Sequence, residues 1–260
     1  MSSRLCISLC LLVVASFTQR ATANPLYSAS AFVDGESSSY GGEDFNDSLA
    51  PVTATANPVI PSGTTALVTA SSDLYAVTSA ADVEGAQDVS EQIFGAGESI
   101  FNFAIDAGDL PALSGVFSIT ASYDINVSAA GLDAATTGYA SLNAFDDFGG
   151  FDTDEVVFLD NGGGIGTLTI SFSGDFTNGV TLQLYSYADA TAGTFEAGAP
   201  ATAHAAVSAT ITSITLDDVE LIDVLPSPIP EPSSLALLAI GGVSIFVTAR
   251  RRRNRRVVNS

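Results

Sequence analysis

The chain has 260 residues and a formal net charge of −21 at pH 7, from 29 acidic residues, eight arginines and no lysine. Hydrophobic residues make up 47% and charged residues 14%, which excludes both a disordered acidic protein and a bundle of membrane helices. No Lys or Arg occurs between Arg20 and Arg250, so nucleic acid is excluded as a partner, because phosphate binding requires cationic side chains.

The N-terminus has the three parts of a secretory signal peptide. Arg4 precedes an apolar run from Leu5 to Phe17, and Ala21-Thr22-Ala23 forms a small-residue cleavage site. Residues 1–23 are therefore predicted to be a signal peptide, with an uncleaved membrane anchor as the alternative. Both cysteines of the chain lie in this segment, so the exported protein is expected to lack thiol and disulfide chemistry.

Residues 24–225 are predicted to form one exported all-β domain, because apolar residues recur with a period of two. The clearest strand runs from Phe117 to Val127, with one apolar and one polar face. One buried and one hydrated face indicates an antiparallel sheet. Eight to ten such strands and no convincing helix before residue 233 predict an antiparallel β-sandwich, jelly-roll-like in architecture.

Breaks in the alternation predict turns and irregularities. The apolar phase slips between Ile211 and Ile214, which predicts a β-bulge near Thr212 and Ser213. Residues 51–61 and the glycine-rich 162–166 are expected to be loops. Residues 174–179 end in Asn-Gly and are expected to join two strands as a hairpin.

The candidate sites of this domain are few. His204 is the single histidine and is expected to be structural or to lie at the surface, since a Ser-His-Asp triad would require it as the base. The acidic segment 146–160 has two interpretations, a solvated acidic turn or a loop that binds Ca²⁺ through carboxylate oxygens. The candidate calcium ligands are Asp146, Asp147, Asp152, Asp154, Glu155 and Asp160.

The C-terminus consists of three successive segments. Residues 226–232 are a proline-rich linker that ends in Pro230-Glu231-Pro232, and residues 233–249 are an uncharged span expected to form one transmembrane helix. Residues 250–260 form an arginine-rich tail expected to stay on the cytoplasmic side. The arginines that give this topology signal are Arg250, Arg251, Arg252, Arg253, Arg255 and Arg256.

The order of proline motif, short span and basic end resembles the PEP-CTERM sorting signal of bacteria that produce exopolysaccharide. The resemblance implies that an exosortase, a membrane protease-transpeptidase, recognises and cuts the tail, and that the protein first sits in the membrane and then reaches the cell surface or the extracellular matrix. The alternative is a single-pass anchor that is never cut.

Three functions of the exported domain are compatible with the sequence. The first is a non-catalytic structural or adhesive protein, and the second is a carbohydrate-binding module that grips exopolysaccharide. An exposed row of tyrosines on one sheet face, such as Tyr185 and Tyr187, would favour the second. The third is a secreted hydrolase, which a deep cleft with two converging carboxylates would favour.

Overall fold

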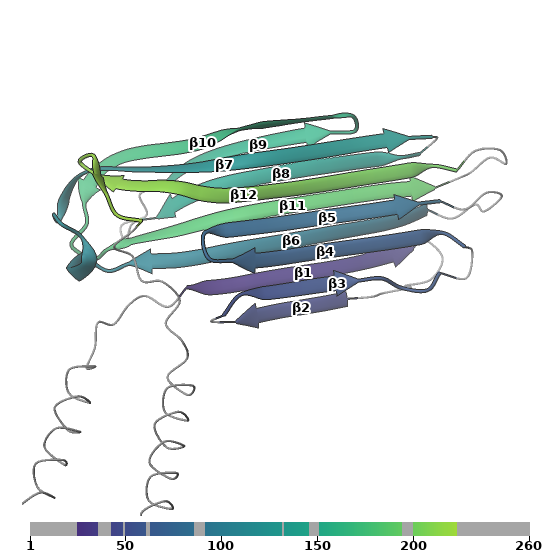
Figure 1. The fold of residues 1–260 in the computed structure, drawn as a ribbon, viewed down its shortest axis with the longest axis horizontal. Coiled ribbons are helices and arrows are strands. Elements are labelled where there is room, and N and C mark those ends of the chain that lie inside the picture. Colours follow the sequence, from purple (N-terminus) through teal and green to yellow (C-terminus); the bar gives the residue numbers. More distant parts are fainter. Residues whose placement is uncertain are drawn as a thin grey trace, which may run out of the picture. The chain divides into compact units, whose positions relative to one another are not determined.

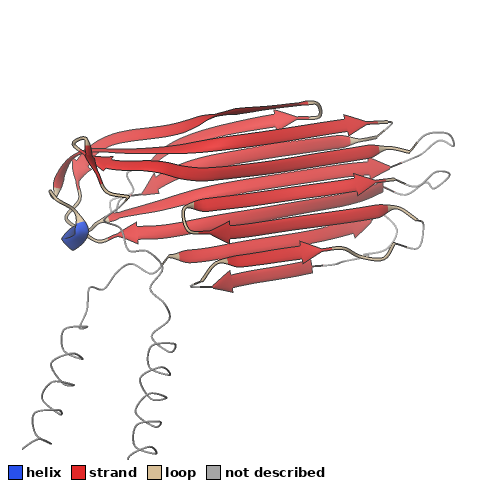
Figure 2. Cartoon of the chain, in the orientation of Figure 1, coloured by secondary structure: helices blue, strands red, loops and turns tan. Residues whose placement is uncertain are grey.

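The computed structural model describes residues 25–35, 43–48, 50–60, 63–85, 92–131, 133–145, 151–193 and 200–222. These residues form strands and one short 3-10 turn, Ala107–Asp109 (Figure 2). The signal peptide, proline motif, apolar span and arginines predicted from the sequence lie outside them. Within the described ranges, no helix is long and apolar enough to cross a membrane.

Two antiparallel sheets form the fold (Figure 1). The first, sheet A, has the strand order β2-β1-β6-β11-β8-β9. Its strands are β1 (Leu26–Gly35), β2 (Glu43–Ser48), β6 (Gln92–Ile105), β8 (Ala135–Phe145), β9 (Phe151–Leu159) and β11 (Val180–Gly193).

The second sheet, sheet B, has the order β10-β7-β12-β5-β4-β3, and the two-residue β13 pairs with β12. Its strands are β3 (Val52–Ala56), β4 (Thr65–Asp73), β5 (Ala76–Glu84), β7 (Ser114–Ala130), β10 (Gly162–Asp175), β12 (Thr202–Leu216) and β13 (Val219–Glu220). The antiparallel β-sandwich predicted from the sequence is confirmed.

Strands β5 to β12 pass between the two sheets in a defined order, and only β8 and β9 follow each other within one sheet. Counted from β5 as the first, sheet B holds the order first-eighth-third-sixth and sheet A the order second-seventh-fourth-fifth. This is the strand order of a jelly roll, in which two Greek keys interlock. Strands β1 to β4 extend both sheets on the side of β6 and β5.

Three local predictions are wrong. Residues 52–56 form strand β3 and residues 162–166 begin strand β10, although both stretches were expected to be loops. Residues 174–179 do not close a hairpin, because β10 belongs to sheet B and β11 to sheet A, so the connection crosses between the sheets. A turn sequence reports a change of direction and not which strand becomes the partner.

The interior is mainly apolar, with serine hydroxyls at its centre, and the two sheets approach closely. Phe101, Phe117 and Ile119 are fully buried, and the burial of β7 alternates as its sequence predicts. At the centre, the Ser79 hydroxyl lies 2.9 Å from the Ser186 hydroxyl across the two sheets. Small residues permit this approach, since a Cβ on Gly97 would lie 2.8 Å from the Thr69 carbonyl oxygen.

The predicted β-bulge is confirmed. The register of β12 against β7 shifts between Ile211 and Ser213, which keeps Ile211 and Ile214 both directed into the core. Without the extra residue, the second half of β12 would present its apolar side chains to solvent.

Candidate functional site

His204 lies on the outer face of sheet B in a cross-strand row with two polar neighbours. It is directly opposite Asp82 of β5 and Ser128 of β7. Its Nδ1 shares a hydrogen bond with the Asp82 carboxylate, and 39% of the His204 side chain is exposed. Within the described residues no hydrogen bond joins His204 to Ser128. The position is that of a surface histidine held by a neighbouring carboxylate.

The described acidic side chains of segment 146–160 are spread over strand β9 and the turn that follows it, and they are not gathered at one point. Asp152 and Asp154 point toward the free edge of β10, where their Oδ2 atoms accept hydrogen bonds from the backbone N–H groups of Ser171, at 3.2 Å, and Thr169, at 2.7 Å. Two carboxylates thus satisfy donors that β10 cannot offer to a neighbouring strand. Further along, Phe158 lies over Gly164, where a Cβ would be 3.3 Å from its ring.

The other candidate calcium ligands point elsewhere. Glu155 belongs to the opposite face of β9, and Asp160 occupies the turn after it with a φ of 58°, where its N–H donates to the Thr136 carbonyl. Asp146 and Asp147 lie outside the described residues. In the part of the chain that the structure describes, no three His, Cys, Asp or Glu side chains come together around a metal position. Calcium binding stays a prediction.

The outer face of sheet A carries a row of tyrosines. Tyr187 of β11 is directly opposite Tyr139 of β8, and Tyr185 is one outward position along β11. The rings of Tyr139 and Tyr185 meet edge to face with centroids 5.6 Å apart, and all three side chains are half-buried. We call this row, with its carboxylate neighbours Glu98, Glu155 and Asp189, the tyrosine face.

Each tyrosine has a carboxylate neighbour, on an adjacent strand for Tyr139 and Tyr185 and on the same strand for Tyr187. The Tyr139 hydroxyl donates to Glu155 Oε2 at 2.7 Å. Burial, and after it the charge of Glu98, raises the pKa of Tyr185 to about 12. Burial, and then the charge of Asp189, likewise raises the pKa of Tyr187. The phenols therefore remain protonated donors at neutral pH, and each carboxylate keeps further lone pairs for an outside donor.

Polar side chains in the adjoining rows of β8 and β11 are held by hydrogen bonds. Asn143 is only 8% exposed although it faces outward, and its Nδ2 donates to Gln183 Oε1 at 3.1 Å and to Ser141 Oγ at 3.3 Å. On the other side of the tyrosines, Phe32 and Phe94 pair with centroids 5.5 Å apart. Aromatic rings thus lie on four neighbouring strands, β1, β6, β11 and β8.

This combination suits a ligand that is flat, hydroxylated and not anionic. Ring faces offer contact to C–H groups, while carboxylates and amides accept or donate hydrogen bonds at the rim. An anionic ligand is disfavoured, since the described part of the chain contains no Lys or Arg to pair with it. Sugar rings have the required chemistry.

Sequence reasoning singled out Tyr185 and Tyr187 but missed their partners. Tyr139, Ser141 and Asn143 are spaced two residues apart, so their common face could have been read from the sequence. Their position opposite β11 was not, because it depends on a pairing between strands far apart in the chain.

The fold and this face define an antiparallel β-sandwich with one aromatic outer surface. Residues 228–253, beyond the described ranges, match the family model of the PEP-CTERM protein-sorting motif, which confirms the predicted sorting signal at the C-terminus. The motif implies a protein that is exported, processed by an exosortase and sorted to the cell surface.

Other comparisons add little. No curated protein matches the chain. The enzymatically active domain of tailspike protein 4 from bacteriophage CBA120 is 11% identical, with a TM-score of 0.21. The match covers 62% of this chain and 19% of the tailspike chain, so the chain spans about a fifth of that protein. A similarity at this level carries no argument about fold or function.

Proposed function

We propose that the exported domain is a non-catalytic structural or adhesive protein of the cell surface or extracellular matrix, and that it adheres by binding polysaccharide on the tyrosine face. The observation that carries the proposal is the row formed by Tyr139, Tyr185 and Tyr187 on one outer sheet face. On the central strands of the opposite sheet the outward side chains are mainly Ser, Thr, Ala and Asp, so the two faces differ in chemistry.

Half-buried rings suit this role. A ring whose rotation is limited by its neighbours loses little conformational entropy when a sugar stacks on it. The edge-to-face contact of Tyr139 with Tyr185 and the hydrogen bond of Tyr139 to Glu155 limit the rotation of these side chains. The face is thus arranged before any ligand arrives.

Affinity electrophoresis tests the proposal. The protein recovered from its cells is run through gels containing the exopolysaccharide of the same cells, and retardation yields an apparent Kd. Tyr185→Ala and Tyr187→Ala are each expected to weaken binding about fivefold, roughly 1 kcal/mol, through loss of an aromatic contact. Tyr187→Phe keeps the ring and is the matched control, expected to remain within about twofold. Alanine variants that fold normally and bind like the parent protein would refute the proposal.

A secreted hydrolase is the second candidate, favoured by the row of Asp82, His204 and Ser128. Acyl transfer also requires N–H donors for the developing oxyanion. Around Ser128 and His204 the strands are paired, β12 on both sides, so their backbone donors are used in the sheet. Incubation with a fluorophosphonate, followed by peptide mass spectrometry, tests whether Ser128 is a nucleophile. A label on Ser128 supports a hydrolase, and its absence rejects serine catalysis at this row.

A further inference from the structure

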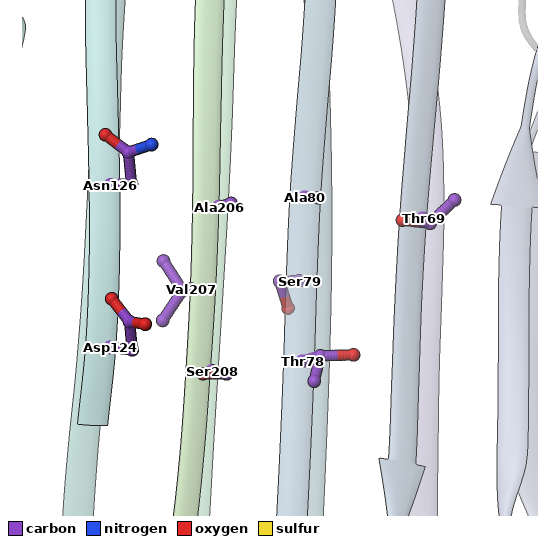
Figure 3. A pocket seen from close by; sticks show the side chains of 9 residues that line it. All are labelled: Thr69, Thr78, Ser79, Ala80, Asp124, Asn126, Ala206, Val207 and Ser208. Carbon is purple, nitrogen blue, oxygen red and sulfur yellow. The ribbon is translucent and has the colours of Figure 1, made fainter. Parts of the chain in front are cut away.

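The outer face of sheet B contains a shallow trough that the tyrosine face does not involve. One hollow of about 260 Å³ is lined by residues of four neighbouring strands, β4, β5, β12 and β7, most of them outward (Figure 3). Its floor is formed by Ala80 and Ala206, with Thr69 on one side and Asp124 and Asn126 on the other.

A second hollow continues the first along the same strands. It also measures about 260 Å³ and is lined by Leu67, Asp82, Glu84, Ser128 and His204, among others. In the strand register, the row that contains Asp82 and His204 is the next outward row after the one that contains Ala80 and Ala206. The two hollows together cover four outward rows, three intervals of about 7 Å, or roughly 20 Å in length.

The two hollows lie in line over four outward rows of the sheet, so the trough that they form is suited to a chain and not to a compact molecule. Its walls carry hydroxyl, amide and carboxylate groups, and its floor of alanine methyl groups can contact the C–H face of a sugar ring. An extended peptide would fit less well, since the four strands are paired on both sides within sheet B along most of the trough and leave few backbone groups for strand addition.

The negative charge of the trough further limits the class of ligand that it can bind. Among the described residues, the side-chain carboxylates of Asp124 and Glu84 have no hydrogen-bond partner, and that of Asp82 pairs only with His204. The chain has no Lys or Arg between residues 20 and 250 to neutralise them. We propose that the trough binds an extended glycan chain bearing free amino groups, with Asp124 and the Asp82–His204 end as ammonium partners.

Isothermal titration calorimetry on the protein recovered from its cells tests the proposal. The salt concentration is about 0.15 M, at which long-range attraction between the acidic protein and a cationic ligand is largely screened. The probe is a soluble oligosaccharide of β-1,4-linked glucosamine, and its fully N-acetylated form is the neutral counterpart. Asp124→Asn removes one carboxylate of the trough. Asp218→Asn removes one exposed carboxylate in the β12–β13 turn, outside the trough, where asparagine tolerates the φ of 65°.

Blocking variants separate shape from charge. Ala206→Ile and Ala80→Ile each fill the floor without altering the net charge, and isoleucine suits a strand. We expect Asp124→Asn and both isoleucine variants to weaken binding at least fivefold, and Asp218→Asn and Tyr187→Ala to stay within twofold. The N-acetylated probe is expected to bind at least fivefold more weakly than the amino form.

Several results would contradict the proposal that the trough binds an amino-bearing glycan. Equal losses from Asp124→Asn and Asp218→Asn would show diffuse attraction of a cation to an acidic protein and overturn the proposal. So would normal binding by both isoleucine variants, if their melting temperatures show that they are folded. Equal binding of the neutral probe would overturn the assignment of amino groups. A loss in Tyr187→Ala alone would place the ligand on the tyrosine face, so the two proposals fail separately.

Discussion

Replacing Gly97 by alanine tests how closely the two sheets are packed. The added Cβ would lie 2.8 Å from the Thr69 carbonyl oxygen and 3.3 Å from Val68 Cγ1, both in the opposite sheet. Ordinary contact begins at 3.4 Å, so the methyl group intrudes on the Thr69 oxygen by 3.4 minus 2.8, about 0.6 Å. A backbone carbonyl fixed in a ladder between two strands cannot turn aside, and the sheets must separate locally.

The expected cost follows from two opposing effects. Overpacking of a filled interior costs about 1–3 kcal/mol. Loss of glycine freedom in the unfolded chain returns about 0.4–1 kcal/mol. The difference between the midpoints of these two ranges is about 1.3 kcal/mol, so the Gly97→Ala variant is expected to lose about that much unfolding free energy, or about 3–5 °C in melting temperature for a domain of this size.

Gly108 provides the matched control. It lies in the 3-10 turn, and a Cβ there would meet nothing within 4 Å. Gly108→Ala should stabilise the protein by about 0.4–1 kcal/mol through the unfolded chain alone. Both variants are measured by thermal and guanidinium unfolding with far-UV circular dichroism. Shifts of the same sign in the two variants would refute the argument that the sheets are in tight contact at Gly97.

Three further predictions concern charge. Burial raises the pKa of Tyr185 from 10.0 to about 12, so its contribution to stability is present below pH 10 and is lost as the pH rises toward 12. The melting temperature should therefore fall across this pH range, and it should fall less steeply in Tyr185→Phe. Tyr75, whose pKa is raised in the same way, accounts for part of the slope that remains in that variant. Asp154→Ala leaves the Thr169 N–H without its acceptor and should lower the unfolding free energy, measured by chemical unfolding, by about 1 kcal/mol. It should also increase self-association, measured by sedimentation velocity, and an unchanged sedimentation coefficient would contradict the role of Asp154 at this edge. If calcium binds the acidic segment, the melting temperature is higher in excess Ca²⁺ than in EDTA, and equal values reject the site.

The sequence predicted the strands that obey a simple alternation. Phe117 to Val127 is buried on one face as its pattern requires, and the slip near Thr212 is a real bulge. Both are local properties, readable from side-chain spacing alone. The wrong predictions at residues 52–56 and 162–166 arose because Thr, Ala and Gly carry little hydrophobic signal.

The site was less accessible than the fold. Tyr185 and Tyr187 were identifiable as one face of a strand, but the apposition of Tyr139 depends on β11 pairing with β8, about 40 residues away in the chain. The trough could not be foreseen, since Ala80 and Ala206 attract no attention until they lie side by side. Residues that make a cavity do so by being small, and small residues carry no functional signature in a sequence.

The carboxylates along β10 have a consequence for a crowded cell surface. Where many copies of a sheet protein are packed at high density, unpaired edges join strand to strand and the layer hardens into fibres. Asp152 and Asp154 occupy the donors through which β10 would enter such a fibre. On this side we expect neighbouring copies to repel through their acidic surfaces instead of joining, so that a layer built from them would deform under load like a gel.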